Sequence, residues 1–219
     1  MGKTVSIICD GEFPKKEYPR YLISKSDYIV CCDNAFKKWL RIGESIMGRK
    51  RLPDAVIGDM DSLPASIKEK YPELIVHISE QEYNDLTKAV KYVLKNYKEL
   101  SEIHIIGGSG KREDHTIANL SLLMEYTRMF PDTDIAIDMV SDWSSAFAIT
   151  DTCQIYVGQG REISIFSPDN SLKIKSEGLV WKTDNVVFDN WWKATLNKTA
   201  TDIVKLTFSH KSMALIIII

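Results

Sequence analysis

Short apolar runs and longer amphipathic stretches alternate along the first 142 residues of the chain. Most of the apolar runs stop at Gly, Asp or Asn, as buried strands that end in a turn do. We predict strands at 4–9, 27–32, 54–57, 74–78, 102–106 and 135–140, a loop or irregular helix start at 12–19, and helices at 85–97 and from about residue 116. This alternation predicts an α/β domain over residues 1–142, with a doubly wound, mostly parallel, Rossmann-like sheet covered by helices on both faces.

The pattern changes after residue 142. Short β-prone runs recur at 146–149, 154–157, 162–166, 172–175, 179–182, 186–188, 202–208 and 213–219. Turn residues such as Gly158, Gly160 and Pro168 separate many of these runs, and no long helical spacing lies between them. We therefore predict a smaller all-β domain over residues 143–219, built as a sandwich or a barrel, and we favour the sandwich.

Composition and charge narrow the function classes. The 219 residues include 44% hydrophobic and 26% charged positions, as in an ordinary globular protein, and the net charge of −2 gives no electrostatic reason to expect nucleic acid or a membrane as a partner. The first residues run directly into a predicted strand rather than a secretory signal, and the apolar run at 214–219 is too short to span a bilayer. None of the four cysteines forms a Cys-x-x-Cys pair, which favours buried free thiols in a reducing cytoplasm over a zinc site.

Two carboxylates follow the predicted strand at 54–57. Asp59 and Asp61 come directly after Gly58, at what would be the carboxyl end of the strand, where open α/β sheets bind ligands. Two like charges this close repel each other unless a cation lies between them. Mg²⁺ usually takes one or two protein carboxylates and completes its shell with water and substrate phosphates. The pair predicts a Mg²⁺ site, and the alternative is that both acids merely cap the next helix.

Three further polar clusters fall at predicted strand ends or helix starts, and all of these positions converge on one edge of a doubly wound sheet. The clusters are Asp33 with Asn34, Gln81 with Asp85, and Arg112, Asp114 and His115 after the glycine-rich turn 107–110. Asn34 suits a left-handed turn conformation. Gly108 and its neighbours would let backbone amides approach a phosphate, and Lys111 and Arg112 add cationic donors, although the turn is not a Walker loop. The alternatives are helix-start acids for Asp85 and Asp114 and a packed, hydrogen-bonded His115.

Together the clusters supply the parts for transfer of a phosphoryl-type group, in which positioning and charge neutralisation do most of the catalysis. Their order and spacing resemble those of the thiamine pyrophosphokinase family. Segments 32–35, 58–62, 81–89 and 107–115 are similar to its Asp-Gly-Gly-Ala, Gly-Asp-Phe-Asp-Ser, Gln-acid-x-Thr-Asp-x-x-Lys-Ala and Gly-rich Arg-x-Asp-His motifs. Within these motifs the chain departs at Asn34 and Lys111, where glycine is usual, and at Asn84, where threonine is usual. In the second domain, Leu196 takes the place of the serine in a Ser-Asn pair that normally contacts thiamine in the family, and Asn197 matches the asparagine.

The resemblance implies an ATP:thiamine diphosphotransferase, an enzyme that forms thiamine diphosphate and AMP from the substrates thiamine and ATP. Mg²⁺ would be held by Asp59, Asp61 and Asp85, which with Arg112 and Asp114 form the expected catalytic set. The expected ATP- and substrate-binding residues are Asp33, Asn34, Gln81, Gly108, Lys111, His115, Trp192, Thr195 and Asn197. The family's members are homodimers that share the thiamine site between the α/β domain of one chain and the β domain of the other.

Two other function classes stay open on the sequence. One is a Mg²⁺-dependent phosphohydrolase or nucleotidyltransferase that uses the same acids. The other is a non-catalytic thiamine- or nucleotide-binding protein of the same fold.

The second domain contains more large aromatic residues than its small core needs, namely Trp181, Trp191 and Trp192. Aromatic residues are enriched at interfaces and ligand pockets, and a flat ring stacks well on a cationic heterocycle such as thiazolium.

Overall fold

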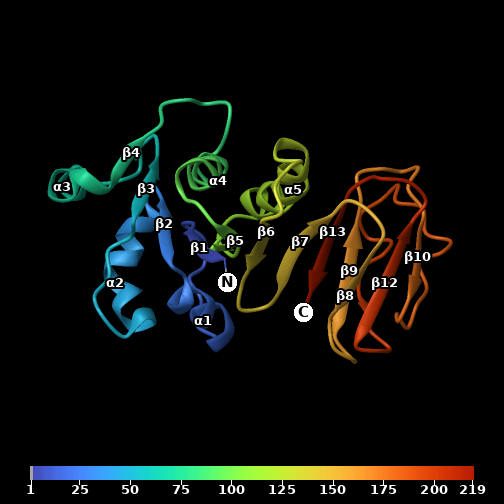
Figure 1. The fold of residues 1–219 in the computed structure, drawn as a ribbon. Helices are drawn as coiled ribbons and strands as arrows, with labels where there is room; N and C mark the ends of the chain where they lie inside the picture. Colours follow the sequence, from blue (N-terminus) through green and yellow to red (C-terminus); the bar gives the residue numbers. More distant parts are fainter. Residues whose placement is uncertain (1) are drawn as a thin grey trace. The chain divides into compact units, whose positions relative to one another are not determined.

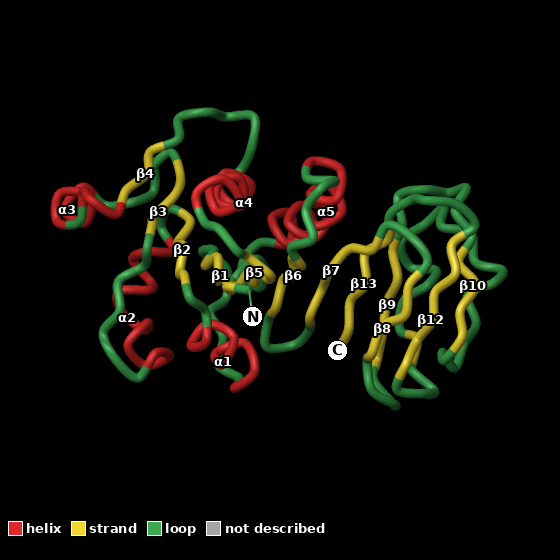
Figure 2. Tube along the Cα trace, in the orientation of Figure 1, coloured by secondary structure: helices red, strands yellow, loops and turns green. Residues whose placement is uncertain are grey.

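The computed structural model describes residues 2–219, which form two units (Figure 1). The first unit contains the chain up to Asn119 together with Thr133–Asp142, and the second contains Leu120–Asp132 and Trp143–Ile219. The first unit mixes helices and strands, whereas strands and loops make up most of the second (Figure 2). Within residues 2–219, no helix has the length and apolar character needed to cross a bilayer.

The first unit carries a parallel sheet. Its strands are β1 (Lys3–Ile8), β2 (Tyr28–Cys32), β3 (Ala55–Gly58), β4 (Ile75–His77), β5 (Leu100–Ile106) and β6 (Ala136–Val140). They lie in the order β6-β5-β1-β2-β3-β4, and every neighbouring pair is parallel. The helices along this part of the chain are α1 (Glu17–Lys25), α2 (Ala35–Met47), α3 (Ala65–Lys70), α4 (Asp85–Asn96) and α5 (Glu113–Met129), with a 3-10 turn at Pro72–Leu74.

Helices cover both faces of this sheet, as predicted. On one face Ile23 of α1 and Phe36 and Trp39 of α2 pack in one buried cluster with Ile8 and Cys31 of the strands. Helix α4 lies on the opposite face and buries Leu86, Ala89, Val90 and Val93, which are the apolar positions of its helical spacing (Figure 1). The predicted doubly wound α/β fold is therefore confirmed.

The strand order reverses next to β1. The chain adds β2, β3 and β4 on one side of β1 and then returns to place β5 and β6 on the other side. In open α/β sheets, the loops after the two strands at such a reversal diverge and leave a crevice at the carboxyl edge. The loops after β1 and β5 therefore flank a ready-made ligand crevice.

Helix α1 begins at Glu17, inside the segment 12–19 predicted as a loop or an irregular helix start, and its first turn tolerates Pro19 because a missing N–H costs little there. One helix boundary differs from the sequence prediction. Helix α5 begins at Glu113 rather than near Thr116, so that Asp114 and His115 belong to its first turn. The acidic residues Glu113 and Asp114 suit that position because the amino end of a helix favours negative charge.

The second unit is a sandwich of two antiparallel sheets, as predicted. One sheet contains β11 (Asn197–Lys198), β9 (Glu162–Phe166), β13 (Ala214–Ile218) and β7 (Ser145–Ile149), and the other contains β10 (Ile174–Glu177), β12 (Ile203–Phe208) and β8 (Cys153–Tyr156). Side chains from both sheets meet in one buried cluster, including Ile165 and Ile216 from the first and Ile174 and Leu206 from the second. Burial between the sheets explains the alternation of apolar residues along β12.

Two of the runs predicted as strands, 179–182 and 186–188, do not form strands. The first makes a single antiparallel bridge, from Leu179 to Thr199, and then leaves the sheet with Val180 and Trp181 exposed. In the second, the backbone turns on a hydrogen bond from Val186 N to Thr183 O, and Phe188 fills the core from a loop. The apolar residues of these two runs indicate that parts of them are buried, but they do not indicate which strand the backbone would pair with.

A buried histidine links β5 and β6. His104 Nδ1 lies 2.8 Å from Asp138 Oδ1 on the neighbouring strand, and Nε2 lies 3.2 Å from Glu102 Oε2. Burial alone would lower the pKa of His104, but the two carboxylates outweigh it and raise the pKa above its usual value. A group whose folded-state pKa is raised stabilises the fold while it is protonated.

We expect this histidine to make stability depend on pH. Its contribution is fully present below the unfolded pKa of about 6.5 and is lost as pH rises through the higher folded pKa. Denaturant unfolding of the wild type and of His104→Gln should therefore show the largest difference in unfolding free energy at acidic pH and a smaller one at alkaline pH. A difference that stays constant with pH would contradict the role of the charged ring.

Candidate functional site

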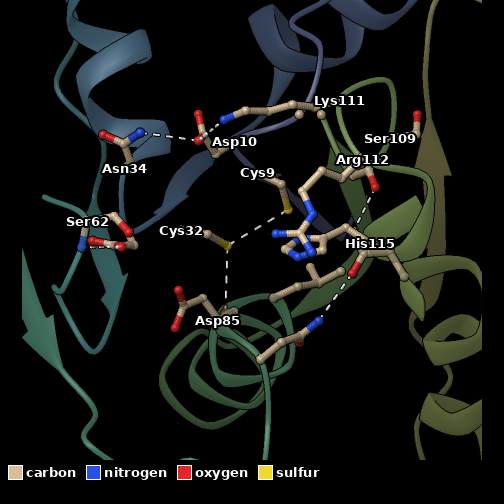
Figure 3. Close-up of a pocket in the computed structure, with 17 residues that line it drawn as sticks. Cys9, Asp10, Cys32, Asn34, Ser62, Asp85, Ser109, Lys111, Arg112 and His115 are labelled. Atoms are coloured by element: carbon tan, nitrogen blue, oxygen red, sulfur yellow. Dashed lines mark hydrogen bonds and ion pairs between the residues drawn. The ribbon is translucent and has the colours of Figure 1, made fainter. Parts of the chain in front are cut away.

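A polar cleft of about 330 Å³ lies at the carboxyl edge of the parallel sheet, at the strand reversal (Figure 3). Its lining comes from segments far apart in the sequence but all from the first unit. They are residues 9–11 after β1, 32–34 at the end of β2 and in the turn after it, Ser62 after β3, 84–86 at the start of α4, Gly107, Gly108, Ser109, Lys111, Arg112 and His115 between β5 and the first turn of α5, and Asn119.

Three carboxylates meet beside this cleft, and two of them, Asp33 and Asp85, line it. Oxygen atoms of Asp33, Asp59 and Asp85 all lie within 4.8 Å of one another. Asp33 N donates to Ile57 O at 2.8 Å, which ties the end of β2 to β3. At Gly58 a Cβ atom would lie 3.0 Å from Asp33 Cβ and 3.2 Å from Asp85 Cγ, so glycine at this position lets the acids converge.

Burial and the neighbouring Lys88 influence the pKa values and the net charge of the three carboxylates. Burial raises the pKa of Asp33 and of Asp85, although Lys88 opposes the shift at Asp85. The pKa of Asp59 is lowered, chiefly because the Asp61 N–H donates to its carboxylate. The Lys88 side chain is only 2% exposed, and its Nζ lies 3.2 Å from Asp85 Oδ1 and 4.0 Å from Asp59 Oδ2. Three ionised carboxylates and one ammonium leave an excess of two negative charges, which matches a divalent cation.

The donor set fits Mg²⁺. Asp33 Oδ1 is buried and has no hydrogen-bond partner among the described residues, a costly state for a carboxylate oxygen unless a cation binds there. Carboxylate oxygens are the hard ligands that Mg²⁺ prefers. Asp33, Asp59 and Asp85 are therefore the residues placed to hold the ion.

Asp61 is the predicted metal ligand that the structure leaves outside this group. Its N–H donates to Asp59 Oδ1 at 3.2 Å across a turn in which Met60 has a φ of 64°, and its side chain is exposed. Asp33, which the sequence predicted as a binding residue, takes the third place in the cluster. Gln81 lies beside the cluster and donates from Nε2 to Asp59 Oδ2 at 3.3 Å.

The sharp turn after β2 also differs in detail from the prediction. The left-handed residue is Asp33, with a φ of 36°, whereas Asn34 has a helical φ of −64°. Asn34 instead uses its side chain and donates from Nδ2 to Asp10 Oδ2 at 3.2 Å. The turn therefore points Asp33 at the acid cluster and Asn34 at the end of β1.

The glycine-rich turn after β5 packs tightly against the loop after β1. Gly11 N donates to Gly107 O at 2.8 Å, and a Cβ atom at Gly11 would collide with the carbonyl oxygens of Gly107 and Ser109. Asn119 of α5 holds the turn from the other side by donating from Nδ2 to Gly108 O at 2.8 Å. This close backbone packing forms a rigid, glycine-lined cradle beside the basic residues.

Asp10 is a charged residue of the cleft that sequence reasoning missed. Its Oδ2 lies 2.7 Å from Lys111 Nζ and its Oδ1 lies 2.8 Å from Lys38 Nζ. Burial opposes ionisation of Asp10, but Lys111, Lys38 and Asn34 together hold its pKa below the usual value. The sequence carries the same signal for Asp10 as for Asp33, because each directly follows a predicted strand, at 4–9 and at 27–32.

Arg112 and Asp114 form a two-bond pair at the start of α5. Arg112 Nε donates to Asp114 Oδ1 at 3.0 Å and Nη2 donates to Oδ2 at 2.5 Å. This pairing raises the pKa of Arg112 and lowers the pKa of Asp114 to about 2. Arg112 and His115 line the cleft opposite Asp85 (Figure 3), whereas Asp114 is outside the lining and orients the guanidinium.

The remaining predicted residues belong to the second unit. Asn197 is buried; its Oδ1 accepts from Trp181 N at 3.2 Å and its Nδ2 donates to Trp181 O at 2.6 Å. Thr195 Oγ1 donates to Trp192 O at 2.7 Å, and the Trp192 ring is 69% exposed. Asn197 and Thr195 therefore hold the backbone of Trp181 and of Trp192, and the side chains of both tryptophans are exposed.

Fold and site together define the class: an α/β protein with a doubly wound sheet, an acid cluster and a basic glycine cradle at its strand reversal, followed by a β-sandwich. Sequence profiles then identify the family. The profile of the thiamin pyrophosphokinase catalytic domain matches residues 19–139, and that of the thiamin pyrophosphokinase substrate-binding domain matches residues 146–216. The chain belongs to the thiamin pyrophosphokinase family.

Relatives agree with this placement. Thiamine pyrophosphokinase 1 of Oryza sativa subsp. japonica is 30% identical over 149 residues, which cover 61% of this chain and 53% of that protein. Thiamin pyrophosphokinase 1 of Caenorhabditis elegans is 31% identical over 109 residues, covering 48% of this chain and 43% of that protein. The chain thus matches about half the length of these curated relatives.

Solved structures share the fold. The thiamine pyrophosphokinase structure from Bacillus subtilis superposes with a TM-score of 0.76 at 20% identity, over 99% of this chain and 98% of that one. The yeast thiamin pyrophosphokinase structure superposes with a TM-score of 0.79 at 15% identity, over 100% of this chain and 87% of that one. At these identities the likeness establishes the architecture of both units.

Proposed function

We propose that the protein is an ATP:thiamine diphosphotransferase, which transfers the β,γ-diphosphoryl group of ATP to the hydroxyethyl group of thiamine. The observation that carries the proposal is the cleft at the strand reversal, in a chain of this family. There, Asp33 and Asp85, which converge with Asp59, line the same cleft as a cradle of glycines with Lys111 and Arg112. Acids for a divalent ion and cations for phosphate oxygens are the two components that transfer from a nucleoside triphosphate needs.

In this proposal Asp33, Asp59 and Asp85 hold Mg²⁺, and Asp61 can join them by rotation of its exposed side chain. When bound, the ion neutralises charge on the phosphates of ATP. Lys88 keeps Asp59 and Asp85 ionised and close together despite the burial of Asp85. Gln81 fixes the orientation of the Asp59 carboxylate.

The basic side of the cleft binds the phosphates. Arg112 donates to phosphate oxygens, and Asp114 orients its guanidinium. Backbone amides of the turn at Gly108 and the amino end of α5 favour the same negative charge. Lys111, Asn34 and His115 border this part of the cleft.

The reaction forms one bond and breaks one. The thiamine hydroxyl oxygen attacks the β-phosphorus, the bond from the β-phosphorus to the oxygen bridging to the α-phosphorus breaks, and AMP leaves with that oxygen. The hydroxyl proton passes to solvent. A loose transition state needs little early proton abstraction, so positioning and charge stabilisation by the cleft suffice without a strong base.

The second unit supplies thiamine contacts in this proposal, through Trp192, Thr195 and Asn197. Asn197 acts by holding the Trp181 backbone, and Trp192 offers an exposed ring to the thiazolium cation. We also propose a homodimer that shares the thiamine site between protomers. Its support is the exposure of Trp181, Trp191 and Trp192 on this unit. Four free cysteines favour a reducing cytoplasm.

Trp192→Ala tests the thiamine contact. A cation–π contact is worth about 0.5–2 kcal/mol, so we expect the KM for thiamine to rise roughly 2- to 30-fold while the KM for ATP changes little. The matched control is Trp143→Ala, another exposed tryptophan of the second unit, which should leave both constants near the wild-type values. Equal increases in both constants for Trp192→Ala would count against stacking on thiamine.

The activity itself is tested by incubating the full chain with ATP, Mg²⁺ and thiamine and separating the products. The proposal predicts AMP and thiamine diphosphate in equal amounts, both dependent on thiamine. Inorganic phosphate or diphosphate released without thiamine would instead identify a phosphohydrolase or nucleotidyltransferase. Binding of both substrates without any product would identify a non-catalytic binding protein.

A further inference from the structure

Two thiols face each other inside the cleft. Cys9 follows β1, and Cys32 is the last residue of the neighbouring strand β2. The register places Ile8 beside Cys31, and the Sγ atoms of Cys9 and Cys32 are 3.9 Å apart. Both residues line the cleft, and Figure 3 shows the pair between Asp85 on one side and Asp10 with Lys111 on the other. The 23 positions that separate them in the sequence hide this pair from motif searches.

The strand geometry places Cys9 and Cys32 at the cleft and Cys31 in the core of the first unit. Successive side chains of a strand point to opposite faces, so Cys31 packs in the buried cluster beneath α1 and α2. Cys32 points the other way, where its Sγ also lies 3.7 Å from the carbonyl oxygen of Asp85. The phosphoryl-transfer proposal uses neither Cys9 nor Cys32, which leaves their role open.

The distance between the two sulfurs decides what they can bind. Two thiolates on one tetrahedral Zn²⁺, each at about 2.3 Å, lie about 3.8 Å apart. A disulfide requires about 2.05 Å and would have to bring the sulfurs nearly 2 Å closer. The observed 3.9 Å suits two ligands of one ion without movement of either strand.

We propose that Cys9 and Cys32 form a binding site for a thiophilic divalent d¹⁰ ion, Zn²⁺ or Cd²⁺, within the cleft. Each thiol gives up its proton when its metal–sulfur bond forms, so binding one ion releases two protons. Sulfur ligands select such soft ions over Mg²⁺, which the oxygen cluster takes. The remaining positions of the ion face the cleft and are filled by water.

An ion on these sulfurs occupies space that the nucleotide phosphates need. This consequence, unlike the binding itself, rests on the proposed function. The thiophilic ion and ATP should then exclude each other, and a thiophilic ion would inhibit the protein by occupying the cleft rather than by displacing Mg²⁺ from the acids.

The test is a titration of the reduced, metal-free full chain with Cd²⁺, followed by the ultraviolet thiolate-to-cadmium charge-transfer band. We expect saturation at one ion per chain with release of two protons. Cys9→Ser and Cys32→Ser should each lose the band, whereas Cys153→Ser, a half-buried cysteine of the second unit, should keep it. A band that survives in Cys9→Ser or Cys32→Ser would overturn the site.

A second measurement on the unmodified chain guards against a variant that fails to fold. Cys9 and Cys32 are buried, so the rate of their alkylation by iodoacetamide in the metal-free chain is the baseline, followed by mass spectrometry. Cd²⁺ should slow the alkylation of Cys9 and Cys32 below this baseline and leave the rate for Cys153 unchanged. Equal slowing of all three, or no slowing of Cys9 and Cys32, would overturn the assignment.

In a metal buffer that fixes free Cd²⁺, ATP at 100 times its Kd should raise the half-saturating free Cd²⁺ about a hundredfold. An unchanged value, with ATP binding shown independently, would overturn the placement of the ion in the nucleotide cleft. The alkylation and charge-transfer results do not depend on activity, so they stand apart from the proposed function.

Discussion

Asp59→Asn is expected to lower kcat by a factor on the order of 10²–10⁴ while leaving the fold intact. The carboxylate lies at the acid cluster beside Asp33 and Asp85, and its substitution removes a charged ligand of the proposed ion. A bound metal contributes several kcal/mol of charge stabilisation, and each 1.36 kcal/mol corresponds to a factor of ten in rate. Asp59 contributes no apolar packing, so thermal unfolding should change little.

Steady-state kinetics over a range of Mg²⁺ concentrations measure this effect. The matched control is Asp132→Asn, which makes the same isosteric change on an exposed loop and should retain wild-type turnover. Near-normal activity of Asp59→Asn at every Mg²⁺ concentration would show that this carboxylate holds no essential ion.

Arg112→Ala is expected to lower kcat/KM on the order of a hundredfold or more. The guanidinium lines the cleft opposite Asp85, where it can donate to the oxygens of a transferring phosphoryl group and stabilise the charge that develops on them. Arg112→Lys should recover only part of the loss, because an ammonium keeps the charge but not the fork that pairs with Asp114.

The control for this arginine lies farther along the same helix. Arg128→Ala removes an exposed guanidinium paired with Glu125, outside the residues that line the cleft, and should leave kcat/KM near the wild-type value. If Arg112→Ala and Arg128→Ala had the same small effect, the basic side of the cleft would not contribute to transfer.

Much of the fold could be predicted because burial leaves a periodic signal. The apolar residues Leu86, Ala89, Val90 and Val93 of α4 recur at helical spacing because that helix rests on a buried sheet. The signal failed in the second unit at 186–188, where Phe188 fills the core from a loop. Hydrophobicity records that a residue is buried, whereas strand pairing depends on distant partners that the local pattern does not contain.

The candidate site shows the same limit at the level of single side chains. Asp59, Asp85 and Arg112 could be located because each follows a strand or opens a helix at one edge of the sheet. The sequence could not predict which three acids form the cluster, because this depends on backbone conformation. The left-handed backbone of Asp33 turns that residue inward, while Asp61 stays exposed. Asp10 was missed because its partners Lys38 and Lys111 are distant in sequence.

We propose that carboxylates after β2 and β3 and at the start of α4 hold one divalent ion opposite a basic cradle for phosphates. A crystal grown with Mn²⁺ and a non-hydrolysable ATP analogue would locate this ion through the anomalous signal of manganese. We expect one strong peak within ligand distance of Asp33, Asp59 and Asp85, with phosphate oxygens of the analogue between that peak and Arg112. A bound analogue whose manganese lies away from these carboxylates would contradict it.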